Sequence, residues 1–423
     1  MTKIPMKSLL FALTLLYPSL LLADWTQFRG SEGQGHAKDD AKPPLKWDEE
    51  ENVAWRIDLP GKGWSSPIVY QGRIYLTTAI ADTRDQDRSG VDRSLDTIAL
   101  DAKTGEILWQ TQVIEQDGRR EANIHKKNSH ASPTPLIAWN HLFVHFGHQG
   151  TACLNLSGKV LWTNQDLTYK PVHGNGGSPI VVGDKLIFSC DGPPDPFVAA
   201  LNVKTGRLVW KTPRRSDASR KFSFCTPILL ETDGRQELIL PGSGNVFAYD
   251  PQNGAELWRS NYGQGYSVVP RPVSGHGLIF ASSGYDRPAI YAVKPGGSGD
   301  VTRSNIAWTH TAKGAPRNAS PLLVGDELYL FDDKGIGSCL DAKTGEVHWQ
   351  ERVGSDMSAS PIYANGRIYA LDEQGTTYVI APGQDYNLLA ENPLDERTLA
   401  SIAVDGNALL IRTESGLFRI EEG

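Results

Sequence analysis

Basic and amide side chains recur in this chain beside one short motif, a hydroxyl residue followed by proline. The motif occurs as Ser66-Pro67, Ser132-Pro133, Ser178-Pro179, Thr226-Pro227, Ser320-Pro321 and Ser360-Pro361, and Arg271-Pro272 takes its place once. The residues in or just ahead of such positions include Lys127, Asn128, His173, Asn175, Lys221, Arg271, Arg317 and Arg397. Arginine binds carboxylates through two parallel N–H donors. Gathered in one place, these residues would bind an anionic or polyhydroxy ligand, or a peptide carboxylate.

A second set of polar residues follows short apolar runs. It consists of Asp191, Tyr285, Asp286 and Asp332. A positioned carboxylate can act as a general base, so these residues are also candidates for proton transfer. The alternative is that the acidic and basic groups pair with one another and only make a polar surface.

Asp85, Asp87 and Asp96 form a weak candidate for a calcium loop. Their spacing, with Gly90 between them, approximates the twelve-residue loop of an EF-hand. Ser89, Arg93 and Asp96 depart from the preferred ligands, and no helices are expected on either side. A solvated loop is the simpler interpretation, and we expect no metal site. His125, His130, His141, His145 and His148 also lack compact metal-ligand spacing.

Sequence motifs of common catalytic centres are absent. The chain contains no P-loop, HExxH, GxSxG or CxxC motif. Its four cysteines are Cys153, Cys190, Cys225 and Cys339, and we expect small buried core residues. A Cys190–Cys225 disulfide stays open, because spacing alone cannot decide it.

An eleven-residue repeat sets the elements that position these groups: Ala-x-Asp-x-x-Thr-Gly-x-x-x-Trp. Ala99–Trp109 matches it at every fixed position, and Ala200–Trp210, Ala248–Trp258 and Cys339–Trp349 each match with one substitution. Cys153–Trp162 is the same unit one residue shorter. Tryptophans in phase with the repeat recur from Trp55 to Trp349. A fixed period of this kind indicates an array of identical structural units.

Each unit is expected to contain four strands. Strand A begins at the hydroxyl-proline motif, strand C ends at the Asp, and Thr-Gly turns the chain into strand D, which carries the Trp. Four-stranded units in radial order are β-propeller blades. Seven blades are expected between Ser66 and about Glu391, and residues 399–420 would join the strand around Trp55 as an eighth.

The sequence therefore predicts an all-β, eight-bladed propeller whose last blade is closed by the N- and C-terminal strands. Closure leaves no open sheet edge in the ring. The D-to-A and B-to-C connections of every blade lie on one face, so both polar sets above would surround the mouth of the central channel.

The first fifty residues predict an export signal followed by a segment that clasps the propeller. Lys3 and Lys7 precede the apolar run 9–23, so residues 1–23 read as a signal peptide, residues 24–50 as an N-terminal clasp and residues 51–423 as the propeller. An uncleaved signal would be a membrane anchor. Cleavage would leave 40 basic and 49 acidic residues, a net charge of −9, which argues against a nucleic-acid partner. We expect a periplasmic or secreted monomer.

The repeat and the hydroxyl-proline motif resemble those of the pyrroloquinoline-quinone (PQQ) repeat propellers, in which the Trp docks neighbouring blades. Residues 25–30 (Trp-Thr-Gln-Phe-Arg-Gly), 127–135, 266–272 and 341–345 resemble an exported bacterial subfamily of PQQ-binding-like repeat proteins. The wider superfamily includes BamB-type outer-membrane assembly factors, which are scaffolds, and quinoprotein dehydrogenases.

The resemblance leaves three hypotheses. The first is an exported, non-catalytic scaffold that needs no cofactor and holds a protein segment or a small anionic or carbohydrate ligand at the channel mouth. The second is a PQQ- and calcium-dependent alcohol or sugar oxidoreductase, with Asp191, Asp286 or Asp332 as base and Arg271 or Arg317 on the quinone carboxylates. Many such enzymes have two adjacent cysteines, and this chain has none. The third is a BamB-like outer-membrane assembly component with envelope partners, although no Cys for a lipid anchor follows the apolar run.

Overall fold

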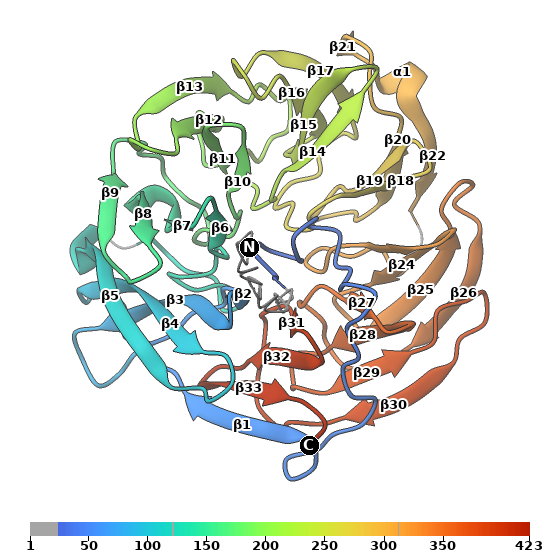
Figure 1. Cartoon of the computed structure of the whole chain (residues 1–423). Helices are drawn as coiled ribbons and strands as arrows, with labels where there is room; N and C mark the ends of the chain where they lie inside the picture. Colours follow the sequence, from blue (N-terminus) through green and yellow to red (C-terminus); the bar gives the residue numbers. More distant parts are fainter. Residues whose placement is uncertain (1–23, 121, 312) are drawn as a thin grey trace, which may run out of the picture.

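The computed structural model describes residues 24–120, 122–311 and 313–423. Eight antiparallel sheets surround a central axis, with the shortest strand of most sheets nearest the centre (Figure 1). The predicted all-β, eight-bladed propeller is therefore confirmed. The expected signal peptide lies outside the described residues.

The first four blades follow one another along the chain. Blade 1 contains β2 (Ile68–Tyr70), β3 (Arg73–Ala81), β4 (Arg93–Asp101) and β5 (Ile107–Gln116). Blade 2 contains β6 (Leu136–Ala138), β7 (His141–His145), β8 (Thr151–Asn155) and β9 (Val160–Asn164). Blade 3 contains β10 (Ile180–Val182), β11 (Lys185–Cys190), β12 (Phe197–Asn202) and β13 (Leu208–Pro213). Blade 4 contains β14 (Ile228–Thr232), β15 (Arg235–Gly242), β16 (Asn245–Tyr249) and β17 (Glu256–Asn261).

The next three blades repeat the pattern with one insertion. Blade 5 contains β18 (Val273–Gly275), β19 (Leu278–Ser282), β20 (Ile290–Val293) and β22 (Ile306–His310). Its connection before β22 carries β21 (Gly299–Asp300), which pairs with β17 of blade 4, and the short helix α1 (Thr302–Asn305). Blade 6 contains β23 (Leu322–Val324), β24 (Glu327–Phe331), β25 (Ile336–Asp341) and β26 (Val347–Arg352). Blade 7 contains β27 (Ile362–Ala364), β28 (Arg367–Leu371), β29 (Thr377–Ile380) and β30 (Leu388–Asn392).

Blade 8 joins the two ends of the chain. β31 (Ala403–Asp405), β32 (Ala408–Arg412) and β33 (Gly416–Ile420) supply three strands, and β1 (Val53–Asp58) pairs antiparallel with β33 as the outer one. The strand that carries Trp55 thus closes the ring, as the sequence predicted. In Figure 1 the C-terminus lies beside β1 at the rim.

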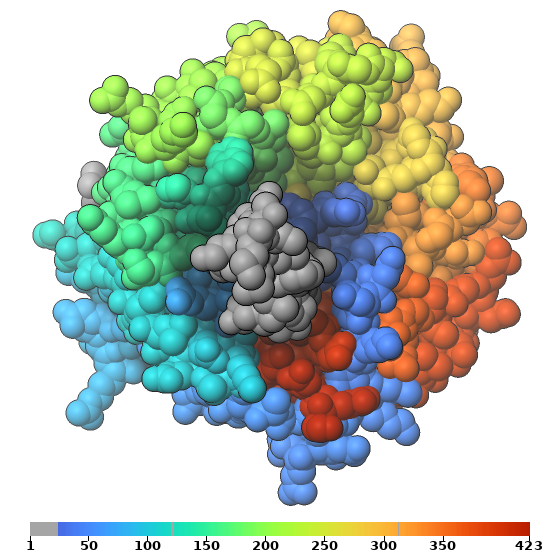
Figure 2. Space-filling view, viewed as in Figure 1, coloured from blue at the N-terminus to red at the C-terminus, as the bar shows by residue number. Residues whose placement is uncertain are grey.

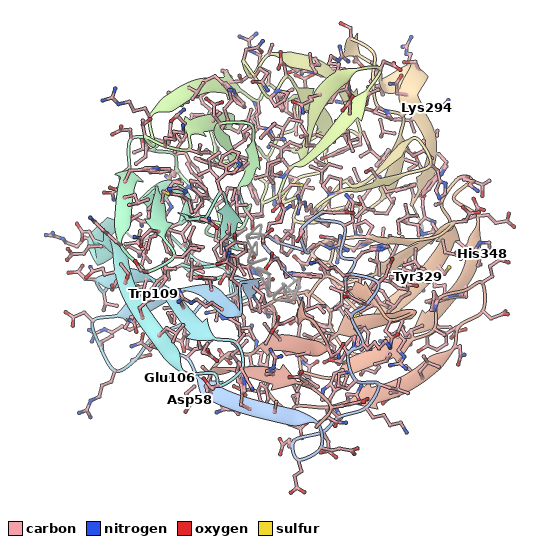
Figure 3. All side chains as sticks on the ribbon, viewed as in Figure 1. Asp58, Glu106, Trp109, Lys294, Tyr329 and His348 are labelled. Atoms are coloured by element: carbon pink, nitrogen blue, oxygen red, sulfur yellow. The ribbon has the colours of Figure 1, made fainter. Side chains whose placement is uncertain are left out.

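Repeated tryptophans dock six of the eight blades onto the next one. Six of them donate their indole N–H to a main-chain carbonyl of the following blade, at 2.9 to 3.3 Å: Trp55, Trp109, Trp162, Trp210, Trp308 and Trp349. The glycine of the next blade's turn lies against the ring, so that a Cβ on Gly206 would be 2.4 Å from Trp162. Figure 3 labels Trp109 on β5, and Glu106 beside Asp58 where blade 1 meets blade 8. The exception is Trp258, which donates to Glu237 of its own sheet.

A hydroxyl ring links the blades around the channel. The residue two positions before strand A is Ser or Thr in seven blades and Arg271 in blade 5. Each hydroxyl oxygen accepts a hydrogen bond, 2.8 to 3.2 Å long, from the main-chain N–H of the equivalent residue in the preceding blade. The members are Ser66, Thr134, Ser178, Thr226, Ser320, Ser360 and Ser401. In blade 2 the member is Thr134, so the expected start at Ser132-Pro133 is two residues too early.

Residues 24–50, the N-terminal segment, cross the channel at the face of the A-to-B turns. The main chains of Trp25 and Val69 exchange two hydrogen bonds of 2.9 Å, and Gly35 and Ala37 pair with Tyr363 of β27. Trp47 then stacks on Tyr369 at the outer end. Figure 1 shows this segment in dark blue, running from the centre past β27–β30 to the rim, and Figure 2 shows it on the surface of the same face.

All four cysteines are buried free thiols. Burial raises the pKa of the Cys153 and Cys339 thiols to about 12, which keeps them protonated and unreactive. Among the described residues, no helix has the length and hydropathy needed to cross a membrane.

Candidate functional site

A cavity of about 580 Å³ opens at the channel mouth, on the face opposite the N-terminal segment. We call it the mouth cavity. Its floor consists of Phe28 from the N-terminal segment and hydroxyl-ring residues of six blades. Its wall comes from the D-to-A and B-to-C connections, as the propeller topology predicts. The channel is therefore closed from below, and the mouth cavity is a pocket with one open end.

An arc of rings forms one side of the wall. The rings of His125, His173, Phe222 and Tyr266 follow one another at centroid distances of 5.3 to 5.5 Å, and Tyr285 lies 5.8 Å beyond Tyr266. Consecutive D-to-A connections supply the first four rings, and Tyr285 comes from the B-to-C connection of blade 5. Burial and the neighbouring His173 lower the pKa of His125, which favours its neutral ring.

Two arginines stack on the end of this arc. The guanidinium of Arg220 lies 4.8 Å from the ring centre of Tyr266 and donates a 2.8 Å hydrogen bond to its hydroxyl. The guanidinium of Arg317 lies 5.0 Å from the ring centre of Tyr285. Arg220, Tyr266, Tyr285 and Arg317 thus form a continuous row of contacts, which we call the clamp, with one arginine at each end. Stacking uses the flat face of a guanidinium and leaves N–H groups at its edge for a ligand.

The opposite side of the wall is made of paired charges. Lys127 forms a 2.6 Å ion pair with Glu373, and Lys334 lies 3.6 Å from Asp356. Asp333 accepts hydrogen bonds from the Arg317 main chain and the Asn318 side chain, while burial raises the pKa of its carboxyl. These acids already have partners, and the charge on this side is largely balanced.

A second hollow, the side groove, extends the mouth cavity over blades 8, 1 and 2. It encloses about 990 Å³ and shares Trp64, His125, Lys127 and Asn128 with the mouth cavity. Its cations are mostly neutralised, because Lys62 pairs with Asp87 and Glu414. Together the two hollows give this face enough room for an extended ligand.

Five of the residues predicted for the site line the mouth cavity: Lys127, Asn128, His173, Tyr285 and Arg317. Asn128 is tied to its neighbours, since its amide donates to the carbonyl of His173 and accepts from Ser132. Arg397 lines the side groove instead, where it pairs with Glu414 and lies over the ring of Trp64.

The other six predicted residues do not line the mouth cavity: Asn175, Asp191, Lys221, Arg271, Asp286 and Asp332. Asn175 is buried behind the wall, where its amide accepts from Tyr169. Asp332 caps its own turn by accepting the N–H groups of Lys334 and Ile336. Asp286 is exposed on a loop, with a positive φ of 86°.

The other three of these six lie away from the mouth cavity for clear physical reasons. Asp191 is buried against Arg214 in an ion pair, and burial raises its pKa to about 6 although Arg214 lowers it in part. Lys221 lines the small hollow beside that pair. Arg271 points into the channel, where it binds the N-terminal segment through the carbonyl of Phe28 and the side chain of Gln27. Burial lowers the pKa of Arg271 to about 10, and it stays charged at pH 7.

The predicted calcium loop is divided among separate partners. Asp87 pairs with Lys62, Asp85 accepts the N–H of Asp87, and Asp96 is buried on β4, where it binds Gln110. In the described part of the chain, no three His, Cys, Asp or Glu side chains lie close enough to hold a metal ion. His145 is buried against Phe188 and binds Thr151.

Sequence reasoning missed the strongest part of the site. Arg220, Phe222 and Tyr266 were not among the predicted residues, although they line the mouth cavity. A signal was present: Arg220 precedes Lys221, and Tyr266 opens the segment 266–272 already noted as a local motif.

These features define the class of protein: an eight-bladed propeller whose central channel is closed at one end and open at the other. The PQQ_2 family model, described as outer membrane protein assembly factor BamB, matches residues 45–119, 97–336 and 299–419. The chain belongs to this family.

Individual relatives are distant. The chain is 26% identical to quinohemoprotein alcohol dehydrogenase ADH IIB of Pseudomonas putida, over 87% of this chain and 56% of the relative. It is 23% identical to BamB of Legionella pneumophila, over 47% of this chain and 48% of that protein. The chain spans about half the length of the curated relatives it matches.

Solved structures agree on the fold. Quinohemoprotein alcohol dehydrogenase from Comamonas testosteroni superposes with a TM-score of 0.65 at 11% identity, over 95% of this chain and 81% of that one. BamB from Moraxella catarrhalis superposes with a TM-score of 0.57 at 13% identity, over 87% of this chain and 97% of that one. Identities this low show the propeller alone, because one fold can serve unrelated functions.

Proposed function

We infer that this protein is an exported, non-catalytic binding propeller that holds a ligand at the channel mouth. The observation that carries this proposal is the mouth cavity itself. It has one open end, a floor of hydroxyl groups, and aromatic and cationic side chains in its wall. Its volume of about 580 Å³ lies in the usual range for ligand sites, which is about 300 to 1,000 Å³. The ligand is a small anionic or carbohydrate molecule, or a segment of another protein.

The arrangement of the carboxylates favours binding over catalysis. A general base must come within hydrogen-bond reach of the proton that it removes. Asp191 is buried in an ion pair with Arg214, and Asp332 accepts a main-chain hydrogen bond from its own turn. Asp286 lies outside the mouth cavity. Each of the three candidate bases is therefore badly placed to act on a molecule in the cavity.

The residues present do not fit PQQ with calcium. Calcium takes about six to eight oxygen ligands, usually with several carboxylates. The acidic side chains lining the mouth cavity are Asp333 and Asp356, and both already bind other groups. Of the two arginines considered for the quinone carboxylates, Arg317 lines the cavity and Arg271 is turned onto Phe28. We therefore derive no redox step for this site.

Family membership favours a second candidate, a BamB-like part of outer-membrane assembly. The match to the BamB family model spans nearly the whole propeller. In that case the ligand at the mouth is a segment of an envelope protein, and the rigid disc presents its loops to that partner.

Blocking the mouth cavity tests the proposed function. Val269→Trp adds a large ring to a partly buried position on the cavity wall. Val347→Trp is the matched control, at an exposed site on β26. The full chain is titrated with neutral and acidic oligosaccharides, acidic peptides, and PQQ with and without calcium. Binding that V269W abolishes and V347W leaves unchanged supports the proposal.

The alternatives give different results. Saturable binding of PQQ that depends on calcium would restore the oxidoreductase hypothesis. Failure of every small ligand, together with a V269W-sensitive complex with a named outer-membrane assembly protein, would support the BamB-like role. Sequencing the N-terminus of the protein recovered from the periplasm or the medium tests export.

A further inference from the structure

The clamp contains two guanidiniums that form no ion pair with a described carboxylate, although the nearby Asp333 carboxyl interacts electrostatically with Arg317. Among the described residues, no carboxylate forms an ion pair with Arg220 or Arg317, whereas Lys127 and Lys334 in the same cavity both have one. The Nε of Arg317 is buried and has no hydrogen-bond partner in the described structure. A buried, unsatisfied donor on a charged group is costly. The Nε itself is enclosed, so a ligand oxyanion would bind the other N–H groups of each guanidinium and supply the ion pair that neither arginine makes within the described residues.

The floor offers hydroxyl hydrogens. Five members of the hydroxyl ring that line the cavity use their oxygen to accept a main-chain N–H: Ser66, Thr134, Ser178, Thr226 and Ser401. No acceptor within the described residues takes their O–H hydrogens. A hydroxyl has one donor hydrogen besides its acceptor lone pairs. The floor therefore presents several converging donors to the oxygens of a ligand.

These features favour a saccharide over a peptide. A bound peptide relies largely on hydrogen bonds between main chains, but main-chain N–H groups of the hydroxyl ring are already donated to side chains. A sugar presents many hydroxyl oxygens and one flat apolar face. Tyr285 is 51% exposed beside the cavity, and Trp64 lies where the cavity meets the side groove. Such rings combine an apolar face with a polar tip.

We propose that the clamp and the hydroxyl ring together bind an acidic saccharide. Carboxylate or sulfate groups of the saccharide lie on the guanidiniums of Arg220 and Arg317, one at each end of the clamp. One sugar ring covers the hydroxyl floor, and further sugar units continue into the side groove. Arginine suits both oxyanions, because its planar N–H groups match their paired oxygens. This inference rests on the proposed function, since it names the ligand class of the same cavity.

The test compares matched probes on the full chain by calorimetry. The probes are an oligogalacturonate, a sulfated galactan oligosaccharide, a neutral galactan of equal length, an oligoglutamate peptide and inorganic sulfate. The variant is Arg220→Gln/Arg317→Gln. The control is Arg207→Gln/Arg303→Gln, which removes the same charge from exposed positions away from the cavity. Thermal melting confirms that each variant is folded.

We expect at least one acidic saccharide to bind at least tenfold more tightly than the neutral one. R220Q/R317Q should lose at least tenfold in affinity, and R207Q/R303Q should stay within about twofold. The two acidic probes distinguish carboxylate from sulfate. Equal binding of acidic and neutral saccharides would contradict the proposal that the clamp binds an acidic saccharide. Binding of oligoglutamate or inorganic sulfate alone would contradict it as well.

Failure of this inference is separable from failure of the proposed function. If V269W abolishes binding of some ligand while R220Q/R317Q does not, the mouth cavity is a binding site and the clamp is not its anchor. If no probe binds the wild-type chain and V269W changes nothing, both are wrong.

Discussion

The guanidinium of Arg271 donates a 2.6 Å hydrogen bond to the main-chain carbonyl of Phe28, 243 residues earlier in the chain. Arg271 occupies the one position of the hydroxyl ring that has no hydroxyl. It gives up one link between blades and ties the ring to the N-terminal segment. Arg29, from that segment, donates in return to the carbonyls of Pro321 and Pro361 at the start of two inner strands. The channel is thus closed by reciprocal arginine contacts.

A substitution at Gly33 tests how closely the N-terminal segment packs against Arg271 in the channel. A Cβ at Gly33 would lie 2.3 Å from Nη1 of Arg271, which is buried and cannot move without losing its contact to Phe28. Gly33→Ala should destabilise the chain by about 2 to 3 kcal/mol, as strain of the left-handed backbone combines with this collision. The control is Gly277→Ala, which has a similar φ of 70° and nothing within 4 Å.

The readouts for Gly33→Ala are urea denaturation and amide exchange at Trp25 and Val69, whose main chains pair. Faster exchange there in G33A alone is expected. If G33A and G277A lose equal stability, the channel contact contributes nothing beyond backbone strain.

Trp162 tests the docking of one blade onto the next. Its indole donates a 2.9 Å hydrogen bond to the carbonyl of Val203, and its ring covers Gly206. Trp162→Phe should cost about 2 kcal/mol, since it removes the donor and part of the packed ring. Trp139→Phe, at a residue 58% exposed, should cost less than about 0.5 kcal/mol. Urea denaturation measures both, and equal losses would contradict a docking role.

The fold could be predicted because the repeat marks strand boundaries directly. Thr-Gly type turns, tryptophans and the hydroxyl-proline motif recur at a similar period in most blades. Together they give the blade count and the pairing of the Trp55 strand with the C-terminal strands. The start of blade 2 was misplaced because Ser132-Pro133 and Thr134-Pro135 are adjacent copies of the motif. The hydrogen bond that the main-chain N–H of Ser66 donates to the Thr134 hydroxyl distinguishes the two copies, and it exists only in three dimensions.

The sequence predicts which loops surround the candidate site, but it does not predict where each side chain of those loops points. The positions of Lys127 and Arg317 follow from topology. Whether a side chain points to the cavity, the channel or the core depends on its neighbours: Arg271 turns to Phe28, and Asp191 turns to Arg214. The clamp was missed because Arg220 and Tyr266 belong to different blades, and only the folded ring stacks them.

Asp191 should make stability depend on pH. Burial raises its pKa from 3.8 to about 6, so its favourable contribution is complete below about pH 4 and is lost as pH rises through 6. Asp191→Asn removes this titration. The stability of wild type relative to D191N should fall by up to about 3 kcal/mol between pH 4 and pH 7.5. Urea denaturation at several pH values measures it, and a relative gain with rising pH would show that the attraction to Arg214 outweighs burial.

His145 should produce the opposite dependence. Its imidazole is fully buried against Phe188, and burial lowers its pKa to about 3. Because the pKa of His145 is lower in the folded chain than its unfolded value of about 6.5, this residue favours folding at pH values above about 6.5. That contribution is lost as the pH falls towards 3. By pH 4 the loss is about 3 kcal/mol.

His145→Phe keeps a ring against Phe188 but removes both the titration and the 2.8 Å hydrogen bond to Thr151. At pH 7.5 it should be about 1 kcal/mol less stable than wild type, because the Thr151 hydroxyl loses its partner. At pH 4 it should be the more stable of the two, so the urea denaturation curves exchange order. Thr151→Val is the control: it removes the same hydrogen bond and retains the imidazole, and it should stay below wild type at both pH values. An H145F chain that remains less stable at pH 4 would mean that the imidazole accepts its proton without cost to the fold.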